Sequence, residues 1–203
     1  MIELAPVLGI LAGLIAIADT IPYVRDTLRG TTRPHRGTWL IWGVLAVVVT
    51  FSQRSDGASW SLIMAGAQAV VTSLIFFLSI RRGEGGLSII DTVMIAIAIG
   101  GVLGWIVADE PIVATICVVA ADLIGAAMMI PKTYRDPASE TLSTFAFASL
   151  GGALAAGAVG SLDVALLLYP IYYCVVNGAI AILIVDRRRA LSSAPRPLGW
   201  DRA

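Results

Sequence analysis

The sequence predicts an all-α membrane protein with seven transmembrane helices, and two observations lead to this fold class. Hydrophobic residues make up 58% of the 203 residues and charged residues only 14%, far from the averages of soluble domains. The apolar residues also come in long blocks, and about 20 such residues span a bilayer as a helix. Backbone that faces lipid must satisfy its own hydrogen bonds, so these blocks are expected to be helices with their loops outside.

Seven segments meet this description, and the second and sixth of them are short. The loops between them leave no room for a soluble domain. The segments are Leu4–Val24, Trp39–Gln53, Ser59–Ile80, Ile89–Val107, Ile112–Ile130, Leu142–Val159 and Val164–Val185.

The placement of the positive charges predicts the orientation of the chain. All lysines and arginines except Arg54 lie in the loops after the first, third and fifth segments and in the C-terminal tail. The positive-inside rule then places the N-terminus outside and the C-terminus in the cytoplasm of a multi-pass plasma-membrane protein. Setting this topology is enough to explain these charges, although the loops could also contact anionic lipid head groups. We expect no nucleic acid partner.

The first segment carries a carboxylate close to its cytoplasmic end. Gly9 and Gly13 are spaced for close packing against another helix. An unpaired carboxylate at membrane depth is costly, so Asp19 is expected to face a cavity or a partner, unless it reaches interfacial water or Arg25. Pro22 is expected to kink or end the helix.

Aromatic and polar residues on the second and third segments are candidates for a binding site. Trp39 and Trp42 share one face of the second segment. Trp39 is best explained as part of an interfacial aromatic belt, whereas Trp42 lies deeper and is a candidate to line a site. Gln68 and Thr72 are four residues apart and share a face of the third segment.

The fourth and fifth segments have contrasting characters. The fourth has no polar side chain in its middle and is expected to be a linker helix without ligand contacts. The fifth carries Asp122 near its centre, where a carboxylate suggests a proton relay, an ion site or a substrate anchor. The alternative is a buried, hydrogen-bonded carboxyl without a functional role. Pro131 is expected to end this helix.

The sixth segment is rich in small residues that allow close packing. On the seventh, Pro170, Tyr173 and Asn177 share one face and suggest a cavity wall, although a buried asparagine can also simply join helices. The two cysteines are expected to pack between helices, and the single histidine, His35, is expected to be a solvated loop residue. With no metal-binding or nucleophilic cluster, we expect neither a metal, a cofactor nor an enzyme.

The two halves of the chain repeat the same order of features. Single matches between apolar segments are weak, but three helices, a linker and three helices place both halves in the same orientation. Such parallel repeats are typical of some transporters. The matched pairs, at offsets of 109, 106 and 105 residues, are Pro22 with Pro131, Thr38 with Thr144, and Thr72 with Asn177.

With these features the chain resembles the SWEET and PQ-loop superfamily of seven-helix transporters over roughly residues 4–188. The resemblance implies two three-helix bundles joined by an inverting fourth helix, with hinges at Pro22 and Pro131. It also implies a pocket that uses polar groups of the third and seventh helices, which here are Thr72 and Asn177. The PQ dipeptide itself is absent, because tyrosine and lysine follow the two prolines.

We therefore expect a transporter of a small polar solute, most simply a sugar, working by alternating access. Trp42, Gln68, Thr72, Tyr173 and Asn177 would face the substrate, and Asp122, with Asp19, would carry a proton if transport is coupled. Three alternatives stay open: an amino-acid substrate, a vitamin substrate resembling nicotinamide riboside, and a receptor that transports nothing. A homo-oligomer also stays open. The expected parts are residues 1–82 and 111–189 as repeats, 83–110 as linker, and 190–203 as a disordered tail.

Overall fold

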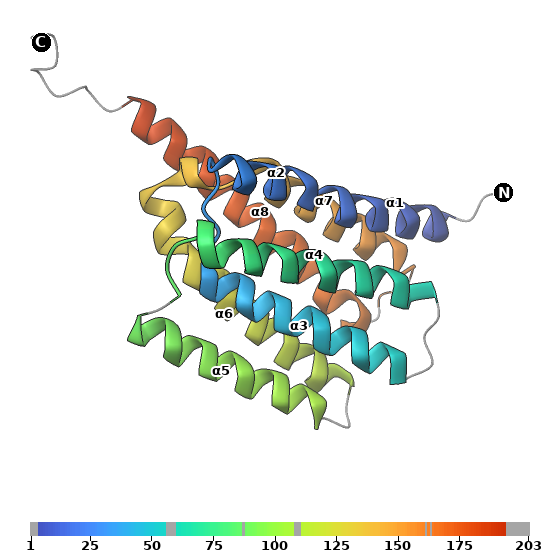
Figure 1. Cartoon of the computed structure of the whole chain (residues 1–203). Coiled ribbons are helices and arrows are strands. Elements are labelled where there is room, and N and C mark those ends of the chain that lie inside the picture. Colours follow the sequence, from blue (N-terminus) through green and yellow to red (C-terminus); the bar gives the residue numbers. More distant parts are fainter. Residues whose placement is uncertain are drawn as a thin grey trace, which may run out of the picture.

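The computed structural model is all-α, as the composition predicts (Figure 1). The structure describes the backbone of residues 4–55, 60–86, 88–107, 111–160, 162 and 164–193, and within these ranges all side chains except 48–55, 60–68, 105–106, 111–112, 114–115 and 165–166. The elements are α1 Leu4–Ala18, α2 Thr20–Arg29, α3 Arg36–Ser55, α4 Trp60–Arg82, α5 Ile89–Ile106, α6 Pro111–Arg135, the 3₁₀ turn η1 Pro137–Ser139, α7 Leu142–Ala158 and α8 Val164–Ser193.

Helices α1 and α2 are one rod interrupted at Asp19, so the described chain contains the seven helices that the sequence predicts. Pro22 explains the interruption, because it has no N–H to donate to the carbonyl of Ala18 four residues earlier. The helix resumes at Thr20 and ends at Gly30, whose φ of 77° is the left-handed conformation of a helix C-cap.

Three predicted helix ends are wrong. The helix expected to end at Val24 continues as α2 to Arg29. Helix α6 continues through Pro131 to Arg135, and its last turn is held by buried Thr133, whose hydroxyl donates to the Met129 carbonyl at 3.0 Å. Helix α8 continues to Ser193 instead of giving way to a tail at residue 190. Arg188, just before the expected tail, donates to the carbonyls of residues 137 and 140. Residues 194–203 of the expected tail lie outside the described residues.

Within the described part of the chain, three helices are long and apolar enough to cross a membrane: Leu4–Arg29, Ile116–Arg135 and Leu167–Ser193. Three shorter apolar helices accompany them at Arg36–Val47, Ile89–Gly104 and Leu142–Ala158. Large apolar side chains project outward from several helices, and Leu4, for example, is 69% exposed. Such outward-facing apolar surface suits contact with lipid.

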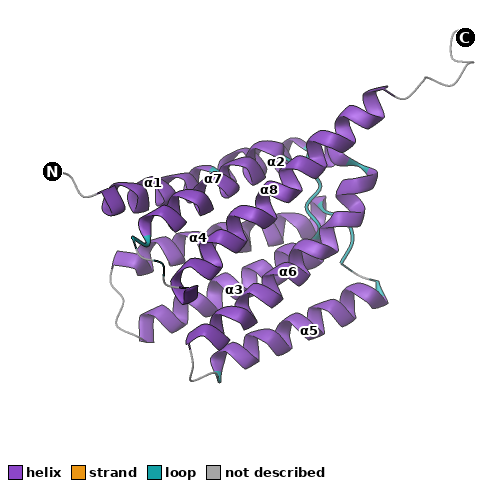
Figure 2. Cartoon of the chain, turned by 180° about the vertical axis from the view of Figure 1, so that it is seen from behind, coloured by secondary structure: helices purple, strands orange, loops and turns teal. Residues whose placement is uncertain are grey.

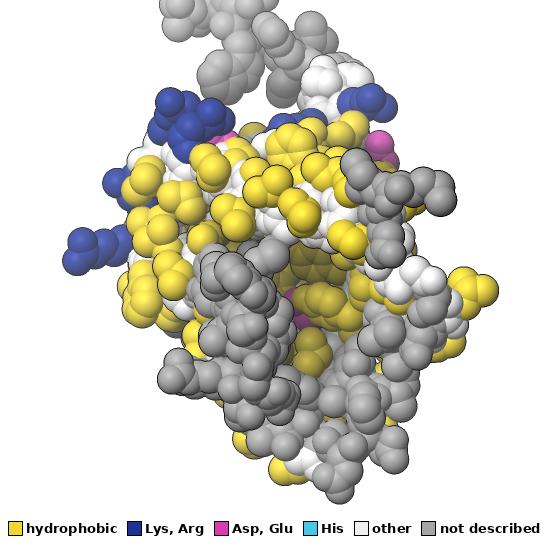
Figure 3. Space-filling view, turned by 90° about the vertical axis from the view of Figure 1, so that its right-hand side faces the viewer, with side chains coloured by type: hydrophobic (Ala, Val, Ile, Leu, Met, Phe, Trp, Pro, Cys, Tyr) yellow, Lys and Arg dark blue, Asp and Glu magenta, His cyan; other side chains and the backbone are white. Residues whose placement is uncertain are grey.

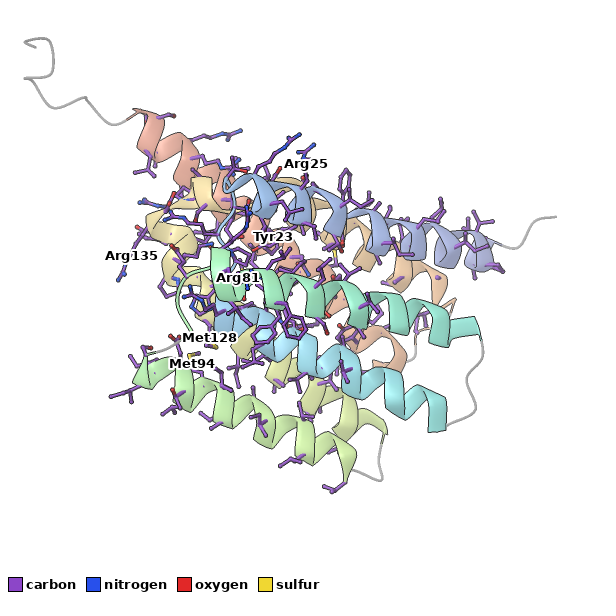
Figure 4. All side chains as sticks on the ribbon, in the orientation of Figure 1. Tyr23, Arg25, Arg81, Met94, Met128 and Arg135 are labelled. Carbon is purple, nitrogen blue, oxygen red and sulfur yellow. The ribbon has the colours of Figure 1, made fainter. Side chains whose placement is uncertain are left out.

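Helices from the two halves of the chain pack in two pairs, α1 along α7 and α3 against α6 (Figures 1 and 2). Helix α4 packs on α3, and α8 packs on both α6 and α7. Helix α5 lies on the outside against α6 and α3, where Met94 packs near buried Met128 (Figure 4). The second buried cluster gathers Tyr23 of α2, Trp39 of α3, Phe145 of α7 and Ile184 of α8.

The closest crossing of α7 and α8 depends on Gly152. A Cβ added there would lie 2.6 Å from the Cys174 backbone nitrogen and 2.9 Å from its Cα. We expect Gly152→Ala to lower the free energy of unfolding by about 1–3 kcal/mol, the usual cost of overpacking. Thermal unfolding in detergent measures this, and Gly100→Ala, where the new Cβ meets nothing within 4 Å, is the control. Equal stability of the two variants would contradict the prediction.

Candidate functional site

A cavity of about 320 Å³ lies between α1, α7 and α8. Glycine and alanine make up most of its wall, because small residues leave space where helices approach each other. The cavity is set toward the end of the molecule where α1 begins and α7 ends. Figure 3 views this end and shows a hollow in which an acidic side chain is visible among hydrophobic ones. The lining residues are Gly9, Ala12, Gly13, Ala16, Asp19, Ala148, Gly151, Gly152, Ala155, Ala158, Tyr169, Pro170 and Tyr173.

Asp19 lines the inner end of this cavity and is only 4% exposed. Its carboxylate accepts a hydrogen bond of 2.8 Å from the Thr20 hydroxyl. Its backbone carbonyl accepts one of 2.7 Å from the hydroxyl of Thr144 on α7, which ties the helix interruption to the opposite half of the chain. Among the described residues, no lysine, arginine or histidine forms an ion pair with Asp19.

Three tyrosines on the first turns of α8 lie between the cavity and Asp122. Tyr169 and Tyr173 line the cavity with their rings stacked, 5.9 Å between centroids and 27° between planes. Tyr172, whose ring centroid lies 6.3 Å from that of Tyr169, donates a hydrogen bond of 2.8 Å to the Asp122 carboxylate on α6. The two aspartates that the sequence singles out are therefore separated by phenol groups, and only Asp19 reaches the cavity.

Beyond Asp19, toward the opposite end of the molecule, four side chains form a buried polar group that we call the Glu140 cluster: Tyr23, Trp39, Lys132 and Glu140. The Trp39 indole donates to the Tyr23 hydroxyl at 3.0 Å, and that hydroxyl donates to Glu140 Oε2 at 3.0 Å. Lys132 Nζ donates to Glu140 Oε1 at 2.5 Å. Tyr23 is 0%, Glu140 1% and Lys132 9% exposed.

The Glu140 cluster joins both halves of the chain. Tyr23 points inward from α2 while Arg25 points away from the protein (Figure 4). Lys132 also donates to the backbone carbonyls of Arg33 and Ser139, and Arg188 donates to the Glu140 carbonyl at 2.6 Å. Burial raises the pKa of Glu140, and the Lys132 cation opposes that change. The pair is thus held in a dry site where the loss of either charge would be costly.

A second set of contacts surrounds His35, which is buried and not solvated as the sequence suggests. Glu84 N donates to the Pro34 carbonyl and Arg36 N to the Glu84 carbonyl, both at 3.0 Å, so the loop after α4 covers the histidine. Its Nδ1 accepts from Thr38 N at 3.3 Å, and its Nε2 lies 3.9 Å from an Asp91 oxygen. Burial lowers the pKa of His35, and Asp91 opposes that change.

This burial predicts that the protein loses stability as the pH falls. Because the pKa of His35 is lowered in the folded protein, the unfolded chain binds its proton first, and stability declines as the pH drops from about 7 toward 5. Melting temperatures of the wild type and of His35→Asn across this range measure the effect. Asparagine can still cap α3 but does not titrate, so its pH slope should be shallower. Parallel slopes would assign the effect to other groups.

The residues expected to bind substrate do not form one group. Tyr173 lines the cavity, and Asn177, one turn further along α8, donates to the Tyr173 carbonyl at 2.9 Å and is 7% exposed. Trp42 donates to the Asp122 carbonyl at 3.3 Å, away from the cavity. Thr72 is buried on α4 and donates to the Ala69 carbonyl at 3.4 Å. The side chain of Gln68 lies outside the described ones.

Several residues of the site were not expected from the sequence. The strongest available signal was the position of Tyr23 and Lys132, each directly after a proline treated as a hinge. Tyr169 lies four residues before Tyr173 and so shares its helix face. No pattern in the sequence pointed to Glu140 as a buried residue.

Comparisons with protein-family models, with curated proteins and with solved structures found no match. The resemblance to the SWEET and PQ-loop superfamily therefore stays a prediction.

Proposed function

We propose that the protein is an integral membrane transporter that moves a small solute by alternating access between two three-helix bundles. One observation carries this proposal: a cavity reaches Asp19 from one end of the molecule, while the Glu140 cluster fills the path at the other end. Tyr23, one turn beyond Asp19, packs edge-on against Phe145, with ring centroids 6.3 Å apart. Its ring is tilted by 50° against that of Trp39, with centroids 4.8 Å apart. A cavity accessible from one side only is what a transporter needs in each of its end states.

Contacts between equivalent positions support the expected repeat of residues 1–82 and 111–189 around the linker 83–110. The hydroxyls of Thr32 and Thr141, 109 residues apart, lie 2.6 Å from each other. Pro22 and Pro131 differ by the same 109 positions. Two-fold related groups meet at their axis, so this contact suits a pseudo-two-fold arrangement. In the expected repeat, α1 corresponds to α6 and α7 corresponds to α3. The pseudo-two-fold rotation therefore relates the contact of α1 with α7 to the contact of α6 with α3, and both contacts are present.

The arginines favour one orientation of this transporter in the plasma membrane. Arg25, Arg81 and Arg135 gather at the end of the molecule that holds the Glu140 cluster (Figure 4). By the positive-inside rule this end faces the cytoplasm, and the cavity opens toward the outside. We therefore assign the structure to an outward-facing state with its cytoplasmic side closed.

The Glu140 cluster is well placed to control the change of state. Tyr23 and Lys132 directly follow the two prolines that we propose as hinges, and both bind the same carboxylate. A change of angle at Pro22 or Pro131 would move one donor away from Glu140. Separation of the cluster would then open the cytoplasmic side.

The cavity gives little support to a sugar as the substrate. Apart from Asp19 and two phenols, its wall is glycine, alanine and proline, whereas a sugar needs many hydrogen-bonding partners. The cavity therefore favours a solute that is largely apolar, and amino acids and vitamins stay as alternatives.

Uptake of a labelled panel of sugars, amino acids and organic ammonium ions into proteoliposomes, with and without a pH gradient, tests transport. Accumulation of any of them above protein-free vesicles supports the proposal. Binding in detergent without uptake would instead make the protein a receptor. If Asp122→Asn transports like the wild type at every pH, Asp122 carries no coupled proton.

A further inference from the structure

We propose that the cavity between α1, α7 and α8 binds a small organic cation, an ammonium group that carries apolar substituents, with Asp19 as its counter-ion. This inference rests on the proposed transport function and names the class of solute. It starts from Asp19, a carboxylate that is nine-tenths buried, lines the cavity, and forms no ion pair among the described residues. A buried carboxylate is costly without an oppositely charged partner, and the cavity beside Asp19 has space for one.

The aromatic wall of the cavity suits a cation. Tyr169 and Tyr173 both line the cavity, with their ring centroids 5.9 Å apart and their planes at 27°. A cation near a tyrosine ring gains about 0.5–2 kcal/mol, with the higher value in a desolvated site. A carboxylate at the inner end and phenol rings at the side are the two components that recognise quaternary and primary ammonium groups.

The remaining wall selects against strongly polar solutes. Glycine and alanine of α1 and α7 offer no side-chain hydrogen bonds, and their backbone groups are largely used within the helices. A solute with hydroxyl groups would lose hydration without replacing it, at a cost of about 1–3 kcal/mol for each unpaired group. Methyl or methylene groups around a single positive charge fit this wall better.

Choline and its neutral isostere 3,3-dimethylbutan-1-ol provide a matched pair of probes. Isothermal titration of the purified protein in nanodiscs should show choline binding at least tenfold more tightly than the alcohol. Asp19→Asn should remove this difference, whereas Asp186→Asn, which removes an exposed carboxylate of α8, should keep it. Equal affinity for the two probes, or no binding of choline, would overturn the proposal.

A pair of tyrosine variants keeps the test valid if Asp19→Asn does not fold. Tyr173→Phe retains the ring and should bind choline nearly as well as the wild type. Tyr173→Leu removes the ring and should weaken binding about fivefold or more, in line with a lost cation–π contact. Similar affinities of the two variants would show that the ring does not contact the cation.

Labelled choline uptake into proteoliposomes separates the two proposals. Choline selectivity without uptake would support the cation site and count against transport. Uptake of another solute without choline selectivity would support transport and overturn the cation site. If Asp19→Asn binds choline with the same affinity as the wild type, Asp19 does not serve as the counter-ion of the cation. That result would also overturn the proposed cation site.

Discussion

Under the proposed transport mechanism, Glu140→Gln is expected to open the side of the protein that we assign to the cytoplasm. The substitution keeps the size of the side chain and an oxygen that accepts from Tyr23, but it leaves the Lys132 ammonium without a counter-charge at 9% exposure. Removing one partner of a buried ion pair costs about 3–5 kcal/mol. In an inward-facing state Lys132 would be hydrated, so this cost falls on the closed state and shifts the population toward opening.

Thiol labelling measures this shift. Ala16→Cys places a reactive group in the cavity, in a background where Cys117 and Cys174 are replaced by alanine. In the parent protein a membrane-impermeant maleimide should label this cysteine from outside only. With Glu140→Gln, labelling from the cytoplasmic side of inside-out vesicles should rise about tenfold or more, since each 1.4 kcal/mol is a factor of ten.

Two further variants control for unrelated effects. Glu84→Gln removes a partly exposed carboxylate 3.3 Å from Arg33 at the same end of the molecule, and a surface pair of this kind contributes at most about 1 kcal/mol. It should leave labelling unchanged. Tyr23→Phe removes the hydrogen bond that Tyr23 donates to Glu140 and the one that it accepts from Trp39. It leaves the ion pair between Lys132 and Glu140 in place and should produce a smaller increase than Glu140→Gln. If the folded Glu140→Gln protein labels like its parent, the cluster does not hold the cytoplasmic side closed.

The helices could be predicted from the sequence because long apolar runs of this kind favour a backbone that satisfies its own hydrogen bonds. Small residues also signalled where helices approach closely: Gly9 and Gly13 of α1 lie along α7, and Gly152 lies against the backbone of Cys174. Asp19 stood out because of its cost in an apolar helix, and the structure places it on the cavity.

The Glu140 cluster could not be predicted in the same way. Lys132 and Glu140 read as loop charges, because the expected helix end at Pro131 would have left both in water. Their burial depends on α6 continuing for one more turn and on η1 folding back over it. Tyr23 reaches Glu140 from 117 positions away, and no periodicity encodes such a contact. The burial of His35 cannot be predicted for the same reason, since its cover comes from the loop at Glu84.

Filling the cavity from Gly9 is expected to block access to Asp19 without disturbing the helices. A Cβ at this position would meet only the Cβ of Ala158, at 3.9 Å, which is ordinary contact. A leucine at residue 9 therefore has room to extend, and Gly9 is one of the residues that line the cavity. Replacing a glycine inside a helix also favours the helix by up to about 1 kcal/mol, so the fold should be retained.

Outside labelling of Ala16→Cys should fall about tenfold or more in the Gly9→Leu protein, because the leucine occupies the route to residue 16. Choline binding should weaken to a similar degree, in proportion to the cavity volume that the new side chain removes. Gly100→Leu makes the same change on α5, where the new Cβ meets nothing within 4 Å and the residue is exposed, and it should alter neither measurement. An equal loss in both variants would point to a general effect of leucine. Full labelling in Gly9→Leu would mean that solutes reach Asp19 by a different path.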